Sequence, residues 1–272
     1  MKQKYALLLA LQSFEFEIHR LRAYSEECPD CYELLQSKLD ALCQFMTSDE
    51  NEALWRQWGN TEEIKQHGER VRSASNQALC YLEKYQSSQL LSQKTSISEY
   101  LSILSSTVRR ELLLFGMDSS SKILFIGSGA FPVSALTMAQ ETGAKVFCLD
   151  TDEEAVALGK RVAEAVGLIT SLTFSGCYQA GLSFLEQATH VVVASLVDDK
   201  HELLGKLQQS AHEDVKIIVR YGNGLKSIFN FPFDVEHSDE WEITPIVHGK
   251  RIYDTVMLQR KRVREMEVTQ GG

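Results

Sequence analysis

The sequence has no excess of basic charge and no long apolar run, and each absence excludes a class of protein. Its 272 residues contain 28 Lys and Arg against 37 Asp and Glu, a formal net charge of −9. Nucleic acid is therefore not expected as a partner, since phosphate binding requires a basic face. Because no run of about eighteen apolar residues occurs, no membrane span is predicted either.

Paired cysteines are also scarce. Cys28-Pro-Asp-Cys31 is a CxxC motif, but no second CxxC follows at the spacing of a zinc site. The motif therefore predicts a turn between two helices with two incidental thiols, and no metal site is expected. Six scattered cysteines fit a reducing compartment, so a cytoplasmic location is expected.

Residues 1–116 are predicted to form an α-helical domain. Apolar side chains recur there at the spacing of one helix face, as at Leu7, Leu11 and Phe14. The first ten residues lack a small-residue cleavage site, so we expect them to begin a helix rather than a leader. The polar, turn-like stretch Gly116-Met-Asp-Ser-Ser-Ser121 marks the expected boundary.

Residues 117–262 alternate between short apolar runs and amphipathic segments, which predicts an α/β domain, and a polar tail follows over 263–272. Such alternation indicates a parallel sheet covered on both faces. Two further apolar runs flank Gly249-Lys250 and predict a hairpin. A parallel core closed by such a hairpin is typical of Rossmann-like, S-adenosylmethionine (SAM)-dependent methyltransferase-type domains. Strands are expected at 122–126, 145–149, 171–175, 190–195 and 215–221, with helices at about 132–142, 153–166, 180–187 and 200–210.

A glycine turn, Gly127-Ser-Gly-Ala-Phe-Pro132, follows the first predicted strand. Glycines in a strand-to-helix turn let the backbone approach a nucleoside closely. Proline at the third-glycine position removes an amide that a pyrophosphate would use, which disfavours NAD, whereas SAM has no phosphate. The residues expected to bind SAM here are Gly127, Ser128, Gly129, Phe131 and Pro132.

An acidic residue ends the second predicted strand. Asp150 lies 23 residues after Gly127 (150 − 127), where a carboxylate accepts hydrogen bonds from ribose hydroxyls. Asp152 either contacts the same ligand or caps the next helix. Because open α/β sheets bind ligands at the carboxyl ends of their strands, the SAM pocket is also expected to include Thr151, Cys177, Ala194, Ser195 and Leu196.

The fifth predicted strand ends in Val219-Arg-Tyr-Gly-Asn-Gly224. Arg220 closes the apolar run, at a place where its planar guanidinium can hold a ligand carboxylate. The alternative for Arg220 is a salt bridge to the helical domain.

Together these motifs resemble nicotianamine synthase. The family carries a comparable glycine turn, an Asp-x-Asp strand end like Asp150-Thr-Asp152, and a Val-Arg segment like that at 219–224. Residues 141–144 and 221–232 are similar to the bacterial members of opine metallophore biosynthesis, the staphylopine type. The order of a helical domain and then a Rossmann-like domain also agrees.

The resemblance implies a histidine 2-aminobutanoyltransferase. Such an enzyme transfers the 3-amino-3-carboxypropyl (aminobutyrate) group of SAM to the α-amine of histidine and releases 5′-methylthioadenosine. Glu111, on the helix before the first strand, would bind and deprotonate the amine. Arg220, Tyr221 and Asn223 would contact the substrate. An opine dehydrogenase would then consume the product, and the assembly is left open, a homodimer included.

Two departures from the family leave one role unassigned. Phe131 replaces a tyrosine of the bacterial relatives, and Asn223 replaces a histidine of the plant enzymes. A hydroxyl role at the site then falls to Tyr178, Tyr221 or Tyr253, and the sequence does not choose among them. Two other functions stay open: an ordinary SAM-dependent small-molecule methyltransferase and a non-catalytic SAM-binding sensor.

Overall fold

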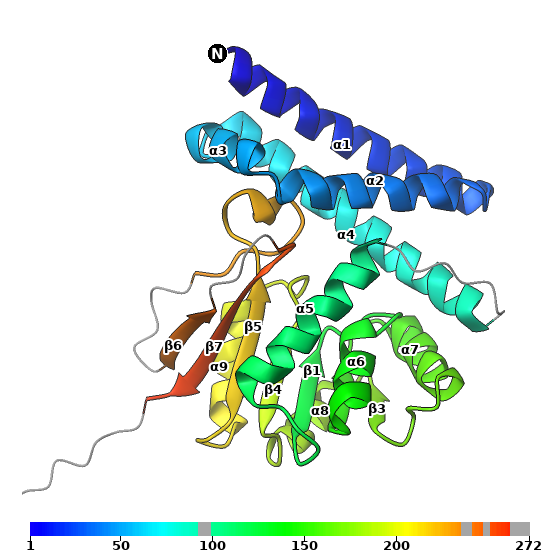
Figure 1. Ribbon diagram of the computed structural model, residues 1–272, viewed down its shortest axis with the longest axis vertical. Coiled ribbons are helices and arrows are strands. Elements are labelled where there is room, and N and C mark those ends of the chain that lie inside the picture. The colour runs from blue at the N-terminus through cyan, green and yellow to red at the C-terminus, as the bar shows by residue number, and fades with distance from the viewer. Residues whose placement is uncertain (92–98, 235–240, 247–250, 262–272) are drawn as a thin grey trace, which may run out of the picture.

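A bundle of four helices lies across one end of an α/β unit (Figure 1). The computed structural model describes residues 1–91, 99–234, 241–246 and 251–261. Within them, no helix combines the length and the apolar character needed to cross a membrane. The bundle helices are α1 (Lys2–Glu27), α2 (Cys31–Met46), α3 (Asp49–Trp58) and α4 (Glu62–Leu91).

The CxxC motif forms the turn between α1 and α2, as predicted. Cys28 is the residue that follows α1, and Cys31 is the first residue of α2. Both cysteines are free. Leu11, Ile18 and Leu35 are fully buried between these helices, which explains the helical spacing of the apolar residues.

A seven-stranded sheet forms the centre of the α/β unit, in the order β3-β2-β1-β4-β5-β7-β6. The first five strands of that order are parallel, whereas β7 runs antiparallel to β5 and to β6. The predicted terminal hairpin is thereby confirmed, although its turn at Gly249-Lys250 lies outside the described residues. The strands are β1 (Lys122–Ile126), β2 (Lys145–Leu149), β3 (Leu172–Ser175), β4 (His190–Val193), β5 (Lys216–Tyr221), β6 (Trp241–Ile246) and β7 (Asp254–Arg260).

Helices cover both faces of the sheet, because alternate strand residues point to opposite sides. On one face, α5, α6 and α7 pack on residues such as Phe125 and Val192. On the other, α8 and α9 pack on residues such as Leu124 and Val193. The helices are α5 (Glu99–Phe115), α6 (Val133–Thr142), α7 (Glu153–Ala165), α8 (Tyr178–Leu185) and α9 (Lys200–Ser210).

Helix α5 belongs by its packing to the sheet rather than to the bundle. Its residues Val108, Leu112 and Phe115 are buried against the sheet face, and in Figure 1 the helix runs along that face. The predicted boundary near residue 116 does fall at a break between elements, since α5 ends at Phe115. The sequence pattern did not reveal which layer the helix covers.

The segment after β5 joins the helical bundle to the α/β unit. The 3₁₀ helix η1 (Gly224–Ile228) follows β5 and lies against α3 and α4. Its residues Leu225 and Ile228 are fully buried in the same core as the bundle helices, together with Phe229 and Tyr253. The bundle therefore shares its hydrophobic core with the α/β unit.

Candidate active site

A cavity of about 530 Å³ lies over the carboxyl ends of the parallel strands, with Cys80 and Glu83 of α4 on its bundle side. The strand order changes direction between β1 and β4, which is where open α/β sheets bind ligands. Small-molecule sites commonly have volumes of about 300–1,000 Å³. The predicted site residues that line this cavity are Gly127, Ser128, Gly129, Phe131, Asp150, Thr151, Asp152, Ala194, Ser195, Leu196 and Arg220.

The glycine turn has a shape that only glycine accommodates. Gly127 and Gly129 have φ angles of +80° and +72°, in the left-handed region. A Cβ on Gly127 would lie 2.7 Å from Cγ2 of Val197, and one on Gly129 would lie 2.3 Å from Oε2 of Glu83. The absence of a side chain at Gly129 therefore leaves room for the Glu83 carboxylate, which comes from the bundle.

Glu83 reaches over this turn from α4. Its carboxylate accepts hydrogen bonds from the amides of Ala130 and Phe131, and one turn later Ser87 donates to the Ala130 carbonyl at 2.7 Å. The side chain is half-buried by area because it faces the cavity, while protein atoms enclose it elsewhere. Burial and the nearby charge of Asp150 raise the pKa of the Glu83 carboxyl to about 8. The cavity thus contains a carboxyl group that exchanges its proton near physiological pH.

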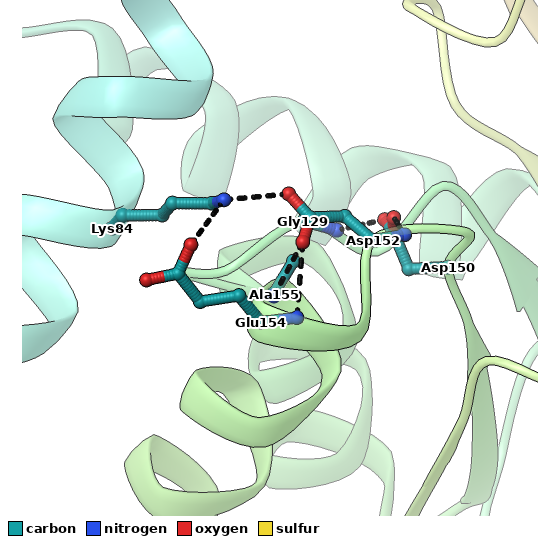
Figure 2. Close-up of polar contacts among 6 residues, drawn as sticks. All are labelled: Lys84, Gly129, Asp150, Asp152, Glu154 and Ala155. Carbon is teal, nitrogen blue, oxygen red and sulfur yellow. Dashed lines mark hydrogen bonds and ion pairs between the residues drawn. The ribbon is translucent and has the colours of Figure 1, made fainter.

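The acidic strand end is held in place by backbone amides (Figure 2). Asp150 Oδ2 accepts from the Gly129 amide at 2.8 Å, and its Oδ1 accepts from the Asp152 amide at 3.1 Å. These bonds fix the Asp150 carboxylate beside the glycine turn, at the end of β2.

Asp152 caps α7 and also contacts the bundle. Its Oδ1 accepts from the amides of Glu154 and Ala155 at 3.0 and 3.3 Å, the cap that the sequence allowed. Its Oδ2 lies 2.7 Å from Nζ of Lys84 on α4, which also contacts Glu154 at 2.6 Å (Figure 2). The hydrogen bond from Lys84 lowers the pKa of Asp152, so the contact between bundle and α/β unit is an ion pair at neutral pH.

A buried lysine shapes the loop after β4. Lys200 is 2% exposed, and its Nζ donates to the carbonyls of Ser195 at 3.2 Å and Phe231 at 3.4 Å. Burial lowers the pKa of Lys200 to about 8. Ser195 is one of the cavity-lining residues, so this interaction sets the course of the cavity wall.

Arg220, at the end of β5, forms a salt bridge and also lines the cavity, so the structure leaves its predicted role toward a ligand carboxylate open. It lines the cavity, and its Nη2 and Nε lie 2.6 and 3.2 Å from Oε2 of Glu111 on α5. Thr255 donates to the other Glu111 oxygen at 3.1 Å. Arg220 and Glu111 are 2% and 1% exposed. Glu111 itself is not a cavity-lining residue; it lies behind the guanidinium that it holds.

Several other predicted residues do not line the cavity. Asn223 exchanges two hydrogen bonds with the backbone of Phe233, at 2.9 and 3.1 Å, and so shapes the loop after β5. Tyr221 packs edge-on against the Phe233 ring. Pro132 and Cys177 directly precede α6 and α8, and neither side chain makes a capping hydrogen bond.

Of the three candidate tyrosines, Tyr178 and Tyr253 line the cavity and Tyr221 does not.

The residue that the sequence analysis did not identify is Glu83. It stands between the apolar positions Leu82 and Tyr85 of its helix, but no motif surrounds it, and only the packing of α4 brings it to the glycine turn. Nowhere in the described ranges do three or more His, Cys, Asp or Glu side chains gather as a metal site.

Comparison with known proteins identifies relatives over nearly the whole chain. Residues 33–266 match the family model described as nicotianamine synthase protein. An L-histidine 2-aminobutanoyltransferase of Pseudomonas aeruginosa is 37% identical over 260 residues, 96% of this chain and 99% of that protein. One from Yersinia pestis is 31% identical over 261 residues, 93% of this chain and 95% of that protein.

Solved structures share the fold. A mutant of MtNAS in complex with S-adenosylmethionine superposes with a TM-score of 0.75 and 14% identity, covering 91% of this chain and 98% of that one. A complex of MtNAS with MTA and tNA gives a TM-score of 0.74 at the same identity, covering 90% of this chain and 97% of that one. The helical part and the Rossmann-like part are therefore both included in the shared architecture.

Proposed function

This chain belongs to the nicotianamine synthase family, and from that premise we propose that it transfers the aminobutyrate group of SAM to the α-amine of L-histidine. Glu83 is the observation that carries the proposal. A carboxyl group with a pKa near 8 faces a ligand-sized cavity that Asp150 and Arg220 also line. Amine activation requires a base of this kind.

The residues of the cavity fit SAM. A carboxylate offers about four lone-pair sites, so Asp150 can accept ribose hydroxyls in addition to its two backbone amides. Ser128 lines the same end, and its buried hydroxyl has no partner among the described residues. Arg220 lines the cavity at the end of β5, where its guanidinium can form an ion pair with the carboxylate of a bound amino acid.

The reaction requires a neutral amine and an accurately placed carbon. SAM, when bound, supplies an electrophilic Cγ, so that a nitrogen–Cγ bond forms as the Cγ–sulfur bond breaks and its electron pair leaves with 5′-methylthioadenosine. The α-amine of histidine is mostly protonated near neutral pH, and ionised Glu83 accepts that proton. Binding of a cationic amine beside Glu83 lowers the pKa of the carboxyl, so the substrate helps to generate its own base.

Glu111 acts through Arg220 in this scheme. Two hydrogen bonds to one carboxylate oxygen hold the guanidinium in a fixed orientation. A fixed guanidinium positions the substrate carboxylate, and thereby the amine, at the distance that the displacement requires. Glu111 is thus a positioning residue, and the base is Glu83.

Turnover with SAM and L-histidine tests the proposal. The protein should release 5′-methylthioadenosine and an aminobutyrate adduct of histidine, which chromatography with mass spectrometry detects. D-histidine and other amino acids serve as comparison acceptors. Release of S-adenosylhomocysteine would instead identify a methyltransferase. SAM binding by calorimetry without turnover of any amino acid would identify a sensor.

We further propose that the product is an intermediate of an opine-type metallophore made in the cytoplasm. The aminobutyrate group brings a primary α-amine into the product. Reductive condensation of that amine with a keto acid is the reaction of an opine dehydrogenase, the class of enzyme expected to act next. The similarity of residues 221–232 to the bacterial metallophore enzymes supports this placement.

Asp150 and Asp152 should differ sharply in their effect on SAM binding. Asp150→Ala removes the ribose acceptor, and hydrogen bonds to a charged group contribute about 1.5–3 kcal/mol. We expect its Kd for SAM, measured by calorimetry, to rise about 10- to 100-fold.

Asp152→Ala is the matched control, since its carboxylate is engaged by the α7 cap and Lys84. It should lower Tm by about 2–4 °C, as expected for a cap of about 1 kcal/mol, with nearly unchanged affinity for SAM. Equal losses of SAM affinity in the two variants would contradict the ribose assignment.

A further inference from the structure

Tyr253 lines the cavity and has a buried hydroxyl. The residue is 2% exposed, its side chain lines the cavity, and its hydroxyl oxygen has no hydrogen-bond partner in the described part of the chain. The Glu111 carboxylate is close enough to influence it, but the two groups do not meet in hydrogen-bond geometry. A buried hydroxyl without a partner is costly, so such a group in a cavity points to a ligand atom that completes it.

The surroundings of this hydroxyl favour an anion. The Arg220 guanidinium lies between two cavity-lining rings, 5.1 Å from the centre of Tyr253 and 5.4 Å from that of Phe125. Arg251, two residues before Tyr253, is 5% exposed, and its Nη1 and Nη2 have no partner among the described residues. The charges of Arg220, Arg251 and Glu111 all act on the Tyr253 hydroxyl, so two positive charges and one negative charge surround it.

The protonation state of Tyr253 suits the same ligand. Burial is the largest influence on this group, and it raises the pKa of the Tyr253 hydroxyl well above its ordinary value. The hydroxyl therefore keeps its proton at physiological pH. A neutral phenol beside guanidinium groups is a hydrogen-bond donor, and carboxylate oxygens are its natural acceptors.

We propose that the Tyr253 hydroxyl donates a hydrogen bond to a substrate carboxylate seated against Arg220, and so recognises the amino-acid portion of that substrate. The inference rests on the proposed function, which supplies two such carboxylates, that of the acceptor histidine and that of the aminobutyrate portion of SAM. Both offer the same chemistry to Tyr253, so the experiment has one arm for each.

Tyr253→Phe tests the contact, because it removes one oxygen and keeps the ring beside Arg220. For a hydrogen bond to a charged group, kcat/KM for histidine should fall about 10- to 100-fold. If the acceptor supplies the carboxylate, the variant should have a raised KM for histidine. With histamine, which keeps the amine and lacks the carboxylate, the variant and the wild type should then have equal kinetic constants. If SAM supplies it, calorimetry shows a Kd for SAM raised by a similar factor. Either result supports the proposal.

Tyr32→Phe is the matched control. Tyr32 is also buried, its hydroxyl likewise has no partner among the described residues, and it lies in the bundle away from the cavity. Its kinetic constants should stay at wild-type values. Neither variant should lower Tm by much, because neither hydroxyl makes a hydrogen bond of good geometry within the described residues.

Two outcomes would overturn the contact. One is a Tyr253→Phe variant with unchanged KM for histidine and unchanged Kd for SAM. The other is a loss of histidine turnover that accompanies a fall in Tm. A wild-type protein that releases no methylthioadenosine would instead defeat the proposed function. Calorimetric titration of SAM and of histidine into wild type and variant then still decides the contact, with equal affinities refuting it.

Discussion

Glu83→Gln should retain SAM binding and lose nearly all turnover. The substitution keeps the shape of the side chain and removes its ability to accept a proton, and general base catalysis contributes about 10²- to 10⁴-fold. We expect kcat for histidine to fall by about that factor, while calorimetry gives a Kd for SAM close to wild type. The measurement is the rate of methylthioadenosine release at saturating SAM and histidine.

The pH profile identifies the group that is lost. Glu83 accepts a proton only when ionised, so kcat/KM of the wild type should rise with pH and level off above about 8, the pKa of this carboxyl. The variant should lose this rise. Glu69→Gln, an exposed position of the same helix, is the control and should keep both the rate and the profile. A wild-type profile in the Glu83 variant would show that the base is another residue.

The same pKa makes a prediction about stability. Folding raises the Glu83 pKa from 4.5 to about 8, so between these values the native state keeps a proton that the unfolded chain has lost. The contribution of this group to stability therefore falls as pH rises through that window and is constant above it. The difference in Tm between Glu83→Gln and wild type should accordingly grow from pH 5 to pH 8 in favour of the variant, as calorimetry can measure.

Glu111→Ala should unfold far more easily than the wild type. The substitution leaves the Arg220 charge without its carboxylate at a site that is 2% exposed. Removing one partner of a buried ion pair typically costs about 3–5 kcal/mol. For a chain of this size, that corresponds to a fall in Tm of about 6–20 °C.

The double variant Glu111→Ala/Arg220→Met distinguishes pairing from catalysis. It removes both charges and should recover part of the lost Tm, because no isolated charge remains buried. Its rate should remain low, since the carboxylate-binding guanidinium is gone. A Glu111→Ala variant with unchanged Tm and abolished turnover would restore the role implied by the family resemblance, with Glu111 acting on the amine directly.

Glu83 and Glu111 show which features of the site can be predicted from the sequence and which cannot. The strands, the glycine turn and Asp150 were predictable because each depends on neighbouring residues: an apolar run, a left-handed turn, an acidic strand end. Strands β1 and β2 fall at 122–126 and 145–149, as predicted. The partners of contacts made across the layers were not predictable. Arg220 and Glu111 are 109 positions apart, and Glu83 meets the glycine turn only because α4 packs above it.

The shared core around Leu225, Ile228 and Phe229 limits how this protein can diversify. Recombination between relatives at residue 116 would join a bundle to an η1 segment that had not evolved to fill it. A viable chimera must therefore exchange residues 224–229 together with the helices that enclose them.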